Sequence, residues 1–185
     1  MTSQEQTIEV SKFFNPDQIL KDIGIEEGMI IADFGAGNGY MTFSAVLLVG
    51  SKGTVYALDV KKSVISHIRA EIKARSISNI KLIWTNLEIF GANPIQDNSV
   101  DVVLIVNTLF QSRKHKQMLM EAKRVAKPGG LIAIVDWKKE SAPFGPPVDE
   151  RVSIEKIKQI SYDMELNKIK EFSAGKYHFG MVFKK

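Results

Sequence analysis

The sequence predicts an α/β fold with a single doubly wound, mostly parallel sheet of about seven strands and a C-terminal antiparallel hairpin. Short apolar runs alternate with amphipathic segments from residue 29 to residue 135, and this order gives parallel strands connected by helices. The run "VDVVLIV" at 100–106 has almost no polar interruption, which is typical of a strand covered on both faces. Near the end, two strand-like runs are joined by "SAGKY", a short glycine-containing connection that favours a hairpin.

Length and composition indicate an ordinary globular chain. Its 185 residues, 44% of them hydrophobic and 25% charged, suit a single domain over 1–185, with residues 1–14 as a flexible arm or short packing segment. The absence of cysteine excludes disulfides and thiolate chemistry. No apolar run approaches the ~20 residues of a membrane helix, and the polar N-terminus does not resemble a signal peptide. We therefore expect a cytoplasmic protein.

The first half of the chain predicts three helices and three strands. Asn15 is the expected N-cap of the first helix, with Pro16 in its first turn and Gly24 as its stop. The following elements are expected at 29–34 (strand), 39–49 (helix), 54–58 (strand, ending at Asp59), 63–75 (helix) and 80–84 (strand).

The second half continues the alternation. The expected elements are a strand at 100–106, a helix at 114–126 that "KPGG" ends, a strand at 131–135, a helix from Ser153 to about 160, and strands at 166–172 and 178–185. Ligands on such sheets bind at the carboxyl ends of the strands. The functional residues should therefore follow the strands, at 33–39, 59, 85–88, 107–111 and 136–140.

The stretch "ADFGAGNGYMTF" at 32–43 combines an acid with a glycine loop. Glycines let backbone approach a ligand closely, and the helix that follows offers free N–H groups. The spacing G-x-G-x-G is not the dinucleotide fingerprint G-x-G-x-x-G, because Tyr40 stands where the third glycine should be. Asp33 would also face a pyrophosphate unfavourably, and no G-K-[ST] follows as in a P-loop. A ligand with an adenosine end, a cationic centre and no phosphate meets these constraints, as S-adenosylmethionine (SAM) does.

The residues "DFGAGNGYMT" resemble the first motif of the class I SAM-dependent methyltransferases. "VYALDV" looks like the second motif, "DNSVDVVLIVNTLFQ" the fourth-strand segment and "EAKRVAKPGGLIAIVDW" the entry to the fifth strand. The closing "EFSAGKYHFGMVFKK" is similar to the terminal hairpin of the subgroup that includes ubiquinone/menaquinone biosynthesis enzymes. The resemblance spans roughly residues 13 to 183 and implies a Rossmann-like methyltransferase fold.

The resemblance also implies SAM as cofactor, S-adenosylhomocysteine as product and a set of cofactor-binding residues. Asp33 would act through the ammonium end of the cofactor, directly or through water, and Asp59 would hold the ribose hydroxyls, although a helix N-cap is an alternative role for Asp59. Relatives usually have an acid that binds the adenine amino group at the position of Asn86, and the alternative role of Asn86 is an ordinary turn. The implied set is Asp33, Gly35, Ala36, Gly37, Asn38, Gly39, Tyr40, Asp59, Val60, Asn86, Leu87 and Asn107.

The expected reaction is an in-line displacement on a small-molecule methyl acceptor. It requires no dedicated acid or base if the acceptor is already nucleophilic, so the sequence names no catalytic residue. Asn107, Thr108, Phe110 and Gln111 are candidates for the methyl-transfer site, with turn formation as the alternative, and Tyr40 would cover the methionine end or pack in the core. We expect residues 138–151 to cover the mouth of the site or to act as a connector. The three histidines show no metal-ligand spacing.

Two other functions remain open at this stage. Residues 1–60 carry three lysines and eight acids, and residues 61–185 carry 22 basic and 13 acidic residues. The basic half favours solvated helix faces over nucleic-acid binding, but it keeps an RNA-directed methyltransferase as an alternative. A non-catalytic SAM-binding regulatory module is the other. The sequence specifies neither the acceptor, nor the atom that is methylated, nor the oligomeric state.

Overall fold

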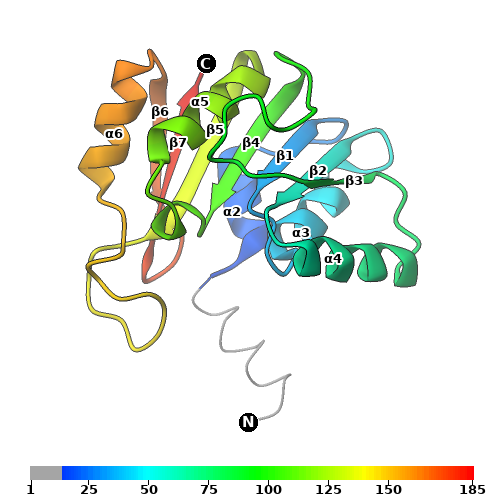
Figure 1. Cartoon of the computed structure of the whole chain (residues 1–185), viewed down its shortest axis with the longest axis horizontal. Coiled ribbons are helices and arrows are strands. Elements are labelled where there is room, and N and C mark those ends of the chain that lie inside the picture. Colours follow the sequence, from blue (N-terminus) through cyan, green and yellow to red (C-terminus); the bar gives the residue numbers. More distant parts are fainter. Residues whose placement is uncertain (1–13) are drawn as a thin grey trace.

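A computed structural model describes residues 14–185 and contains a seven-stranded sheet with the order β3-β2-β1-β4-β5-β7-β6 (Figure 1). All neighbouring strands from β3 to β5 pair in parallel, and β7 pairs antiparallel with both β5 and β6. The doubly wound sheet with its C-terminal antiparallel hairpin is thereby confirmed. The N-terminal arm predicted for residues 1–14 lies, except for Phe14, outside the described residues.

The first half of the chain forms the predicted elements within one or two residues. The side chain of Asn15 accepts a hydrogen bond from the Gln18 N–H at 3.2 Å, and Gly24 ends the helix with φ of 92°. The elements are α2 (Pro16–Ile23), β1 (Ile30–Phe34), α3 (Tyr40–Val49), β2 (Thr54–Asp59), α4 (Lys62–Ala74) and β3 (Ile80–Trp84).

The second half differs from prediction at one strand. Its elements are β4 (Val100–Val106), η1 (Leu109–Gln111), α5 (His115–Val125), β5 (Ala126–Trp137), α6 (Ile154–Asp163), β6 (Asn167–Ser173) and β7 (His178–Lys184). The expectation that "KPGG" precedes a strand starting at residue 131 was wrong, because β5 begins at Ala126 and runs through these residues. Its register against β4 shifts between Val100 and Val102, and Gly129 adopts φ of 79°, so the strand passes through an irregularity there.

Apolar side chains cover both faces of the sheet. Residues of β4 alternate between the two cores: Val103 and Ile105 pack with the α5 and α6 side, and Val102 and Leu104 with the α2 and α3 side. The side chains of β4 are nearly all buried, as the apolar run predicted. Because β1 pairs in parallel with both β2 and β4, the carboxyl ends of these three strands lie at the same edge of the sheet.

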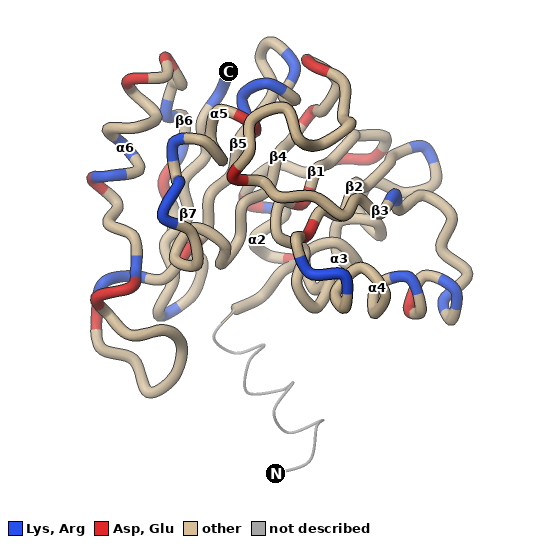
Figure 2. Tube along the Cα trace, in the orientation of Figure 1, with Lys and Arg blue, Asp and Glu red and all other residues tan. Residues whose placement is uncertain are grey.

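Charged side chains are distributed over the outer elements. Lys and Arg are interspersed with Asp and Glu on α4, α6 and the β6–β7 hairpin (Figure 2). On α5, Arg124 pairs with Glu121 at 2.7 Å and with Asp97 at 2.5 Å. Just beyond this helix, Lys127 pairs with Asp101 at 2.6 Å. These two basic side chains are therefore paired with acids of the same chain. Within residues 14–185, no helix is long and apolar enough to cross a membrane.

Candidate functional site

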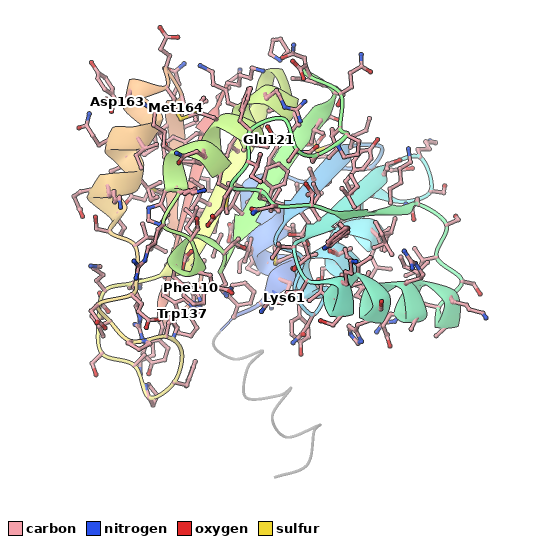
Figure 3. The ribbon with its side chains drawn as sticks, in the orientation of Figure 1. Lys61, Phe110, Glu121, Trp137, Asp163 and Met164 are labelled. Carbon is pink, nitrogen blue, oxygen red and sulfur yellow. The ribbon has the colours of Figure 1, made fainter. Side chains whose placement is uncertain are left out.

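A cleft of about 350 Å³ lies at the carboxyl ends of the parallel strands. Its walls come from the segments that follow β1, β2, β3 and β4, as expected for an open α/β sheet. Lys61, after β2, and Phe110, after β4, both lie near this edge of the sheet (Figure 3). The lining residues are Gly35, Gly37, Asp59, Val60, Lys61, Val64, Asn86, Leu87, Glu88, Thr108, Gln111, Ser112 and Met118.

The three glycines of the loop after β1 all have positive φ, but for different reasons. A Cβ on Gly35 would lie 2.5 Å from the Oγ1 of Thr108, and one on Gly39 would lie 2.6 Å from the ring of Phe43. These two glycines are required by packing within the protein. A Cβ on Gly37 would meet only the carbonyl oxygen of Gly35, at 3.9 Å. Because Gly37 lines the cleft, its missing side chain leaves room for a ligand.

Asp59 connects the end of β2 to the glycine loop. Its carboxylate accepts hydrogen bonds from the N–H groups of Gly37 at 3.1 Å and Lys61 at 2.8 Å. The side chain lines the cleft, and each carboxylate oxygen has a second lone pair that is available to a ligand. The N-cap of α4 is Lys61, so the alternative role of Asp59 as that N-cap is wrong.

Asp33 lies beneath the glycine loop, outside the cleft lining. It is 1% exposed, and its carboxylate accepts a hydrogen bond from the Thr42 hydroxyl at 2.5 Å. Burial raises the pKa of Asp33 to about 6, and the nearby charge of Asp59 adds to the rise. The carboxylate therefore fixes the first turn of α3 against β1, and Asp33 is not among the residues that line the cleft.

The segment after β3 forms the wall of the cleft next to β2. The side-chain amide oxygen of Asn86 accepts a hydrogen bond from the N–H of Glu88 at 2.9 Å, which closes a local turn and leaves the second lone pair of this oxygen for a ligand. The carboxylate of Glu88 accepts a hydrogen bond from the Ser112 hydroxyl at 2.6 Å. This bond joins the β3 and β4 sides of the cleft. Glu88 therefore both lines the cleft and connects two of its walls.

The opposite wall is the segment around η1, and a buried carboxylate on β5 holds it. Asp136 is fully buried and accepts hydrogen bonds from the N–H groups of Leu109 at 3.0 Å, Phe110 at 3.3 Å and Trp137 at 2.8 Å. Burial raises its pKa to about 6. Sequence reasoning placed residue 136 in a functional segment but did not single it out, although an acid at the end of an apolar strand was the available signal.

Half of the predicted cofactor residues line the cleft. These are Gly35, Gly37, Asp59, Val60, Asn86 and Leu87. The others, which lie behind or beside the lining, are Asp33, Ala36, Asn38, Gly39, Tyr40 and Asn107. Of the methyl-transfer candidates, Thr108 and Gln111 line it and Phe110 does not.

Individual residues of this second group differ in environment. Tyr40 is 58% exposed, so its alternative role in core packing is wrong. Asn107 has φ of 52°, and its buried Oδ1 has no hydrogen-bond partner among the described residues.

Sequence reasoning missed four lining residues. Lys61 and Val64 follow Asp59 closely, and this proximity was a usable signal. Ser112 and Met118 carried no such signal. Met118 is both 3% exposed and part of the cleft wall. The segment 138–151 contributes nothing to this lining.

The lining chemistry fits the adenosine end of SAM. The cleft presents an open glycine face, the carboxylates of Asp59 and Glu88, and the apolar side chains of Leu87 and Met118. A ribose diol supplies two donors for Asp59, and an adenine ring suits the apolar wall. No group of three His, Cys, Asp or Glu side chains within the described region is placed to hold a metal ion.

Comparison with known proteins agrees with the geometry. A sequence profile of the methyltransferase domain matches residues 25–176. The chain belongs to the methyltransferase domain family. The crystal structure of a SAM dependent methyltransferase from Aquifex aeolicus is 32% identical, with a TM-score of 0.87 over 94% of this chain and 91% of that one. The resemblance to class I SAM-dependent methyltransferases and the Rossmann-like fold are confirmed, and family membership supports SAM as the cofactor.

Curated relatives of this methyltransferase domain include quinone-pathway enzymes. The ubiquinone/menaquinone biosynthesis C-methyltransferase of Shewanella oneidensis is 32% identical over 117 residues, which cover 63% of this chain and 45% of that protein. The demethylmenaquinone methyltransferase of Staphylococcus aureus is 30% identical over 127 residues, 68% of this chain and 50% of that protein. The chain thus spans about half the length of the curated relatives it matches.

Proposed function

We propose that this protein is a SAM-dependent methyltransferase that transfers a methyl group to a small-molecule acceptor. The observation that carries the proposal is the pairing of Gly37 and Asp59 at one cleft. Gly37 leaves open space where any other residue would place a side chain, and Asp59 directs a carboxylate into the same space. Family membership and the Aquifex aeolicus structure support it further.

Each wall of the cleft has a distinct role in this proposal. Asp59 would hold the ribose, the Leu87 N–H and the apolar wall would receive the adenine, and Gly37 would allow close backbone approach. When bound, SAM supplies an electrophilic methyl group on a sulfonium centre. The protein then contributes mainly proximity and alignment, which can lower a barrier by ~7–11 kcal/mol. The backbone segment held by Asp136 fixes the wall on the acceptor side.

We infer that the methyl acceptor is a quinone-type or hydroxylated aromatic compound. The inference comes from the names of the matched relatives, which refer to ubiquinone, menaquinone and demethylmenaquinone. We also infer one domain over 1–185 and a cytoplasmic location, as the sequence predicts.

Calorimetry with SAM and S-adenosylhomocysteine tests cofactor binding, and conversion of SAM to S-adenosylhomocysteine with a panel of reduced quinones tests turnover. We expect both ligands to bind and a reduced quinone to be methylated. Binding of SAM without turnover on any small acceptor would favour the non-catalytic module. Salt-dependent RNA binding with methylation of RNA would favour the RNA-directed alternative.

A further inference from the structure

His178 is a buried histidine beside the aromatic side chain at the end of β5. It is the first residue of β7, pairs with Trp137 at the end of β5, and is 2% exposed. Neither Nδ1 nor Nε2 has a hydrogen-bond partner within residues 14–185. Most buried polar side-chain atoms have a partner, and an exception requires an explanation. An apolar residue would fill this position without the desolvation cost.

Aromatic rings surround this imidazole. The ring centroid of Trp137 lies 4.1 Å away at an interplanar angle of 45°, and that of Phe14 lies 5.1 Å away, edge to face. Trp137 also contacts Phe144, with centroids 5.9 Å apart. The Arg151 guanidinium also lies 5.2 Å from the indole centroid. Aromatic faces with a neutral hydrogen-bonding side chain among them would suit a flat organic ligand.

The histidine is neutral at physiological pH. Burial, together with the positive charges of Arg151 and Lys138, lowers the pKa of His178 to about 4. A neutral imidazole has one nitrogen that donates a hydrogen bond and one that accepts. It therefore suits a neutral hydroxyl group better than a carboxylate or phosphate.

This aromatic cluster lies beside the cleft, at the same edge of the sheet. Asp136, which precedes Trp137, accepts the N–H of Phe110, and Figure 3 shows Phe110 and Trp137 near each other at this edge. The cleft side of the same segment carries Thr108 and Gln111. The segment around η1 therefore borders both the cleft, through Thr108 and Gln111, and the end of β5 that carries Trp137.

The residues that cover His178 lie outside the helices and strands. Phe14 precedes α2, and the segment 138–151 contains no helix or strand. Within this segment, Gly145 packs so closely on Trp137 that a Cβ would lie 2.6 Å from the indole. Movement of Phe14 or of this segment would open the imidazole to a ligand without disturbing the sheet.

We infer that His178 hydrogen-bonds the methyl acceptor, and that this acceptor is a planar aromatic molecule with a hydroxyl group, bound against Trp137 at the carboxyl ends of β5 and β4. The inference rests on the proposed function and extends it to a residue and a binding mode. His178 binds and orients the acceptor, with its acceptor nitrogen directed at the hydroxyl hydrogen.

The test compares two probes that differ in one hydrogen-bond donor, 1-naphthol and 1-methoxynaphthalene. Calorimetric titrations use the full chain saturated with S-adenosylhomocysteine. We expect the parent to prefer 1-naphthol by about tenfold, the effect of one net hydrogen bond, and His178→Phe to bind both probes equally. His67→Phe, at an exposed position on α4, is the matched control and should keep the preference.

Folding of the variant is checked by its melting temperature. His178→Phe removes two unpartnered polar atoms and should melt no lower than the parent. A second measurement needs no variant: the ring ¹⁵N signals of His178 in the parent should shift when 1-naphthol is added, while those of His67 stay unchanged. A merely structural histidine would show no such shift.

The outcomes separate this inference from the proposed function. If SAM does not bind in its own titration, the proposed function fails. If SAM and 1-naphthol bind but His178→Phe keeps the hydroxyl preference and the ring signals do not move, the role of His178 is wrong. If SAM binds and neither naphthalene probe does, the inferred acceptor class is wrong.

Discussion

The carboxylate of Asp59 accepts a hydrogen bond from the backbone N–H of Gly37 at 3.1 Å, across 22 positions of sequence. The bond joins the end of β2 to the loop after β1, and both residues line the cleft. One carboxylate therefore fixes the glycine loop and faces the ligand. Substitution of Asp59 tests the contact with the ribose, and substitution of Gly37 tests the space for the cofactor.

Replacing Asp59 with Ala should weaken SAM and S-adenosylhomocysteine to the same extent. The ribose is unchanged by methyl transfer, so this contact is uniform binding that does not favour the transition state. Loss of a hydrogen bond to a charged group costs ~1.5–3 kcal/mol, or roughly one to two decades in affinity. Calorimetry with both ligands measures it. Selective loss of SAM alone would contradict the ribose role, and binding of NADH with SAM inert would overturn the cofactor assignment.

Replacing Gly37 with Val should abolish SAM binding and leave the fold largely intact. The branched side chain would occupy the cleft. The backbone at position 37 has a positive φ of 52°, which would add strain of about 1–3 kcal/mol in a residue other than glycine. Gly28→Val is the matched control, because Gly28 also has positive φ and a Cβ there meets nothing within 4 Å. It lies outside the cleft lining, so it should lose stability but keep SAM affinity. Parent-like affinity in Gly37→Val would show that the loop does not contact the cofactor.

Local patterns predicted the sheet and the central part of the site. The glycine spacing predicted the position of Gly37, and the end of the second strand predicted that of Asp59. Both positions depend on residues near in sequence, as does the buried strand that the apolar run of β4 predicted. The segments that contain Glu88 and Asp136 were predicted, but the roles of these two side chains were not, because they come from long-range contacts, to Ser112 and to the segment around η1. The early start of β5 depends on pairing with β4, which overrides the stop signal of the glycines.

Asp136 should make folding stability depend on pH in a defined direction. Its pKa is raised from 3.8 to about 6 by burial, so between these values the folded state binds more protons than the unfolded state. Its contribution is therefore most favourable below pH 4, and it diminishes as pH rises through 6, by a total of about 3 kcal/mol.

Urea unfolding of the parent and Asp136→Asn at several pH values measures this contribution. The variant lacks the titrating group, so its stability relative to the parent should increase between pH 4 and pH 7. Asn keeps one accepting oxygen, so the variant loses only the hydrogen bonds made to the other carboxylate oxygen. This loss adds a constant offset that does not alter the slope. A difference independent of pH would contradict the raised pKa.

The segment 138–151 should become protected from hydrogen exchange when S-adenosylhomocysteine and an acceptor bind together. The buried guanidinium of Arg151 already donates hydrogen bonds to the carbonyl oxygens of Lys138, Glu140 and Pro146. Phe144 packs on Trp137 from the same segment. An acceptor against Trp137 would give this segment a further surface to pack on, and closure of such segments excludes water from reacting groups.

Hydrogen exchange with and without both ligands, using 1-naphthol as acceptor, follows the amides of Ser141, Ala142, Phe144 and Gly145. We expect slower exchange in the complex and faster exchange in Arg151→Gln, which loses the bonds to the three carbonyls. Arg151→Gln should also raise the KM for the acceptor and leave the Kd of SAM unchanged, since the segment is absent from the cofactor cleft. Lys156→Gln, at an exposed position on α6, is the control for loss of a positive charge. Unchanged exchange in a complex that turns over would make this segment a connector.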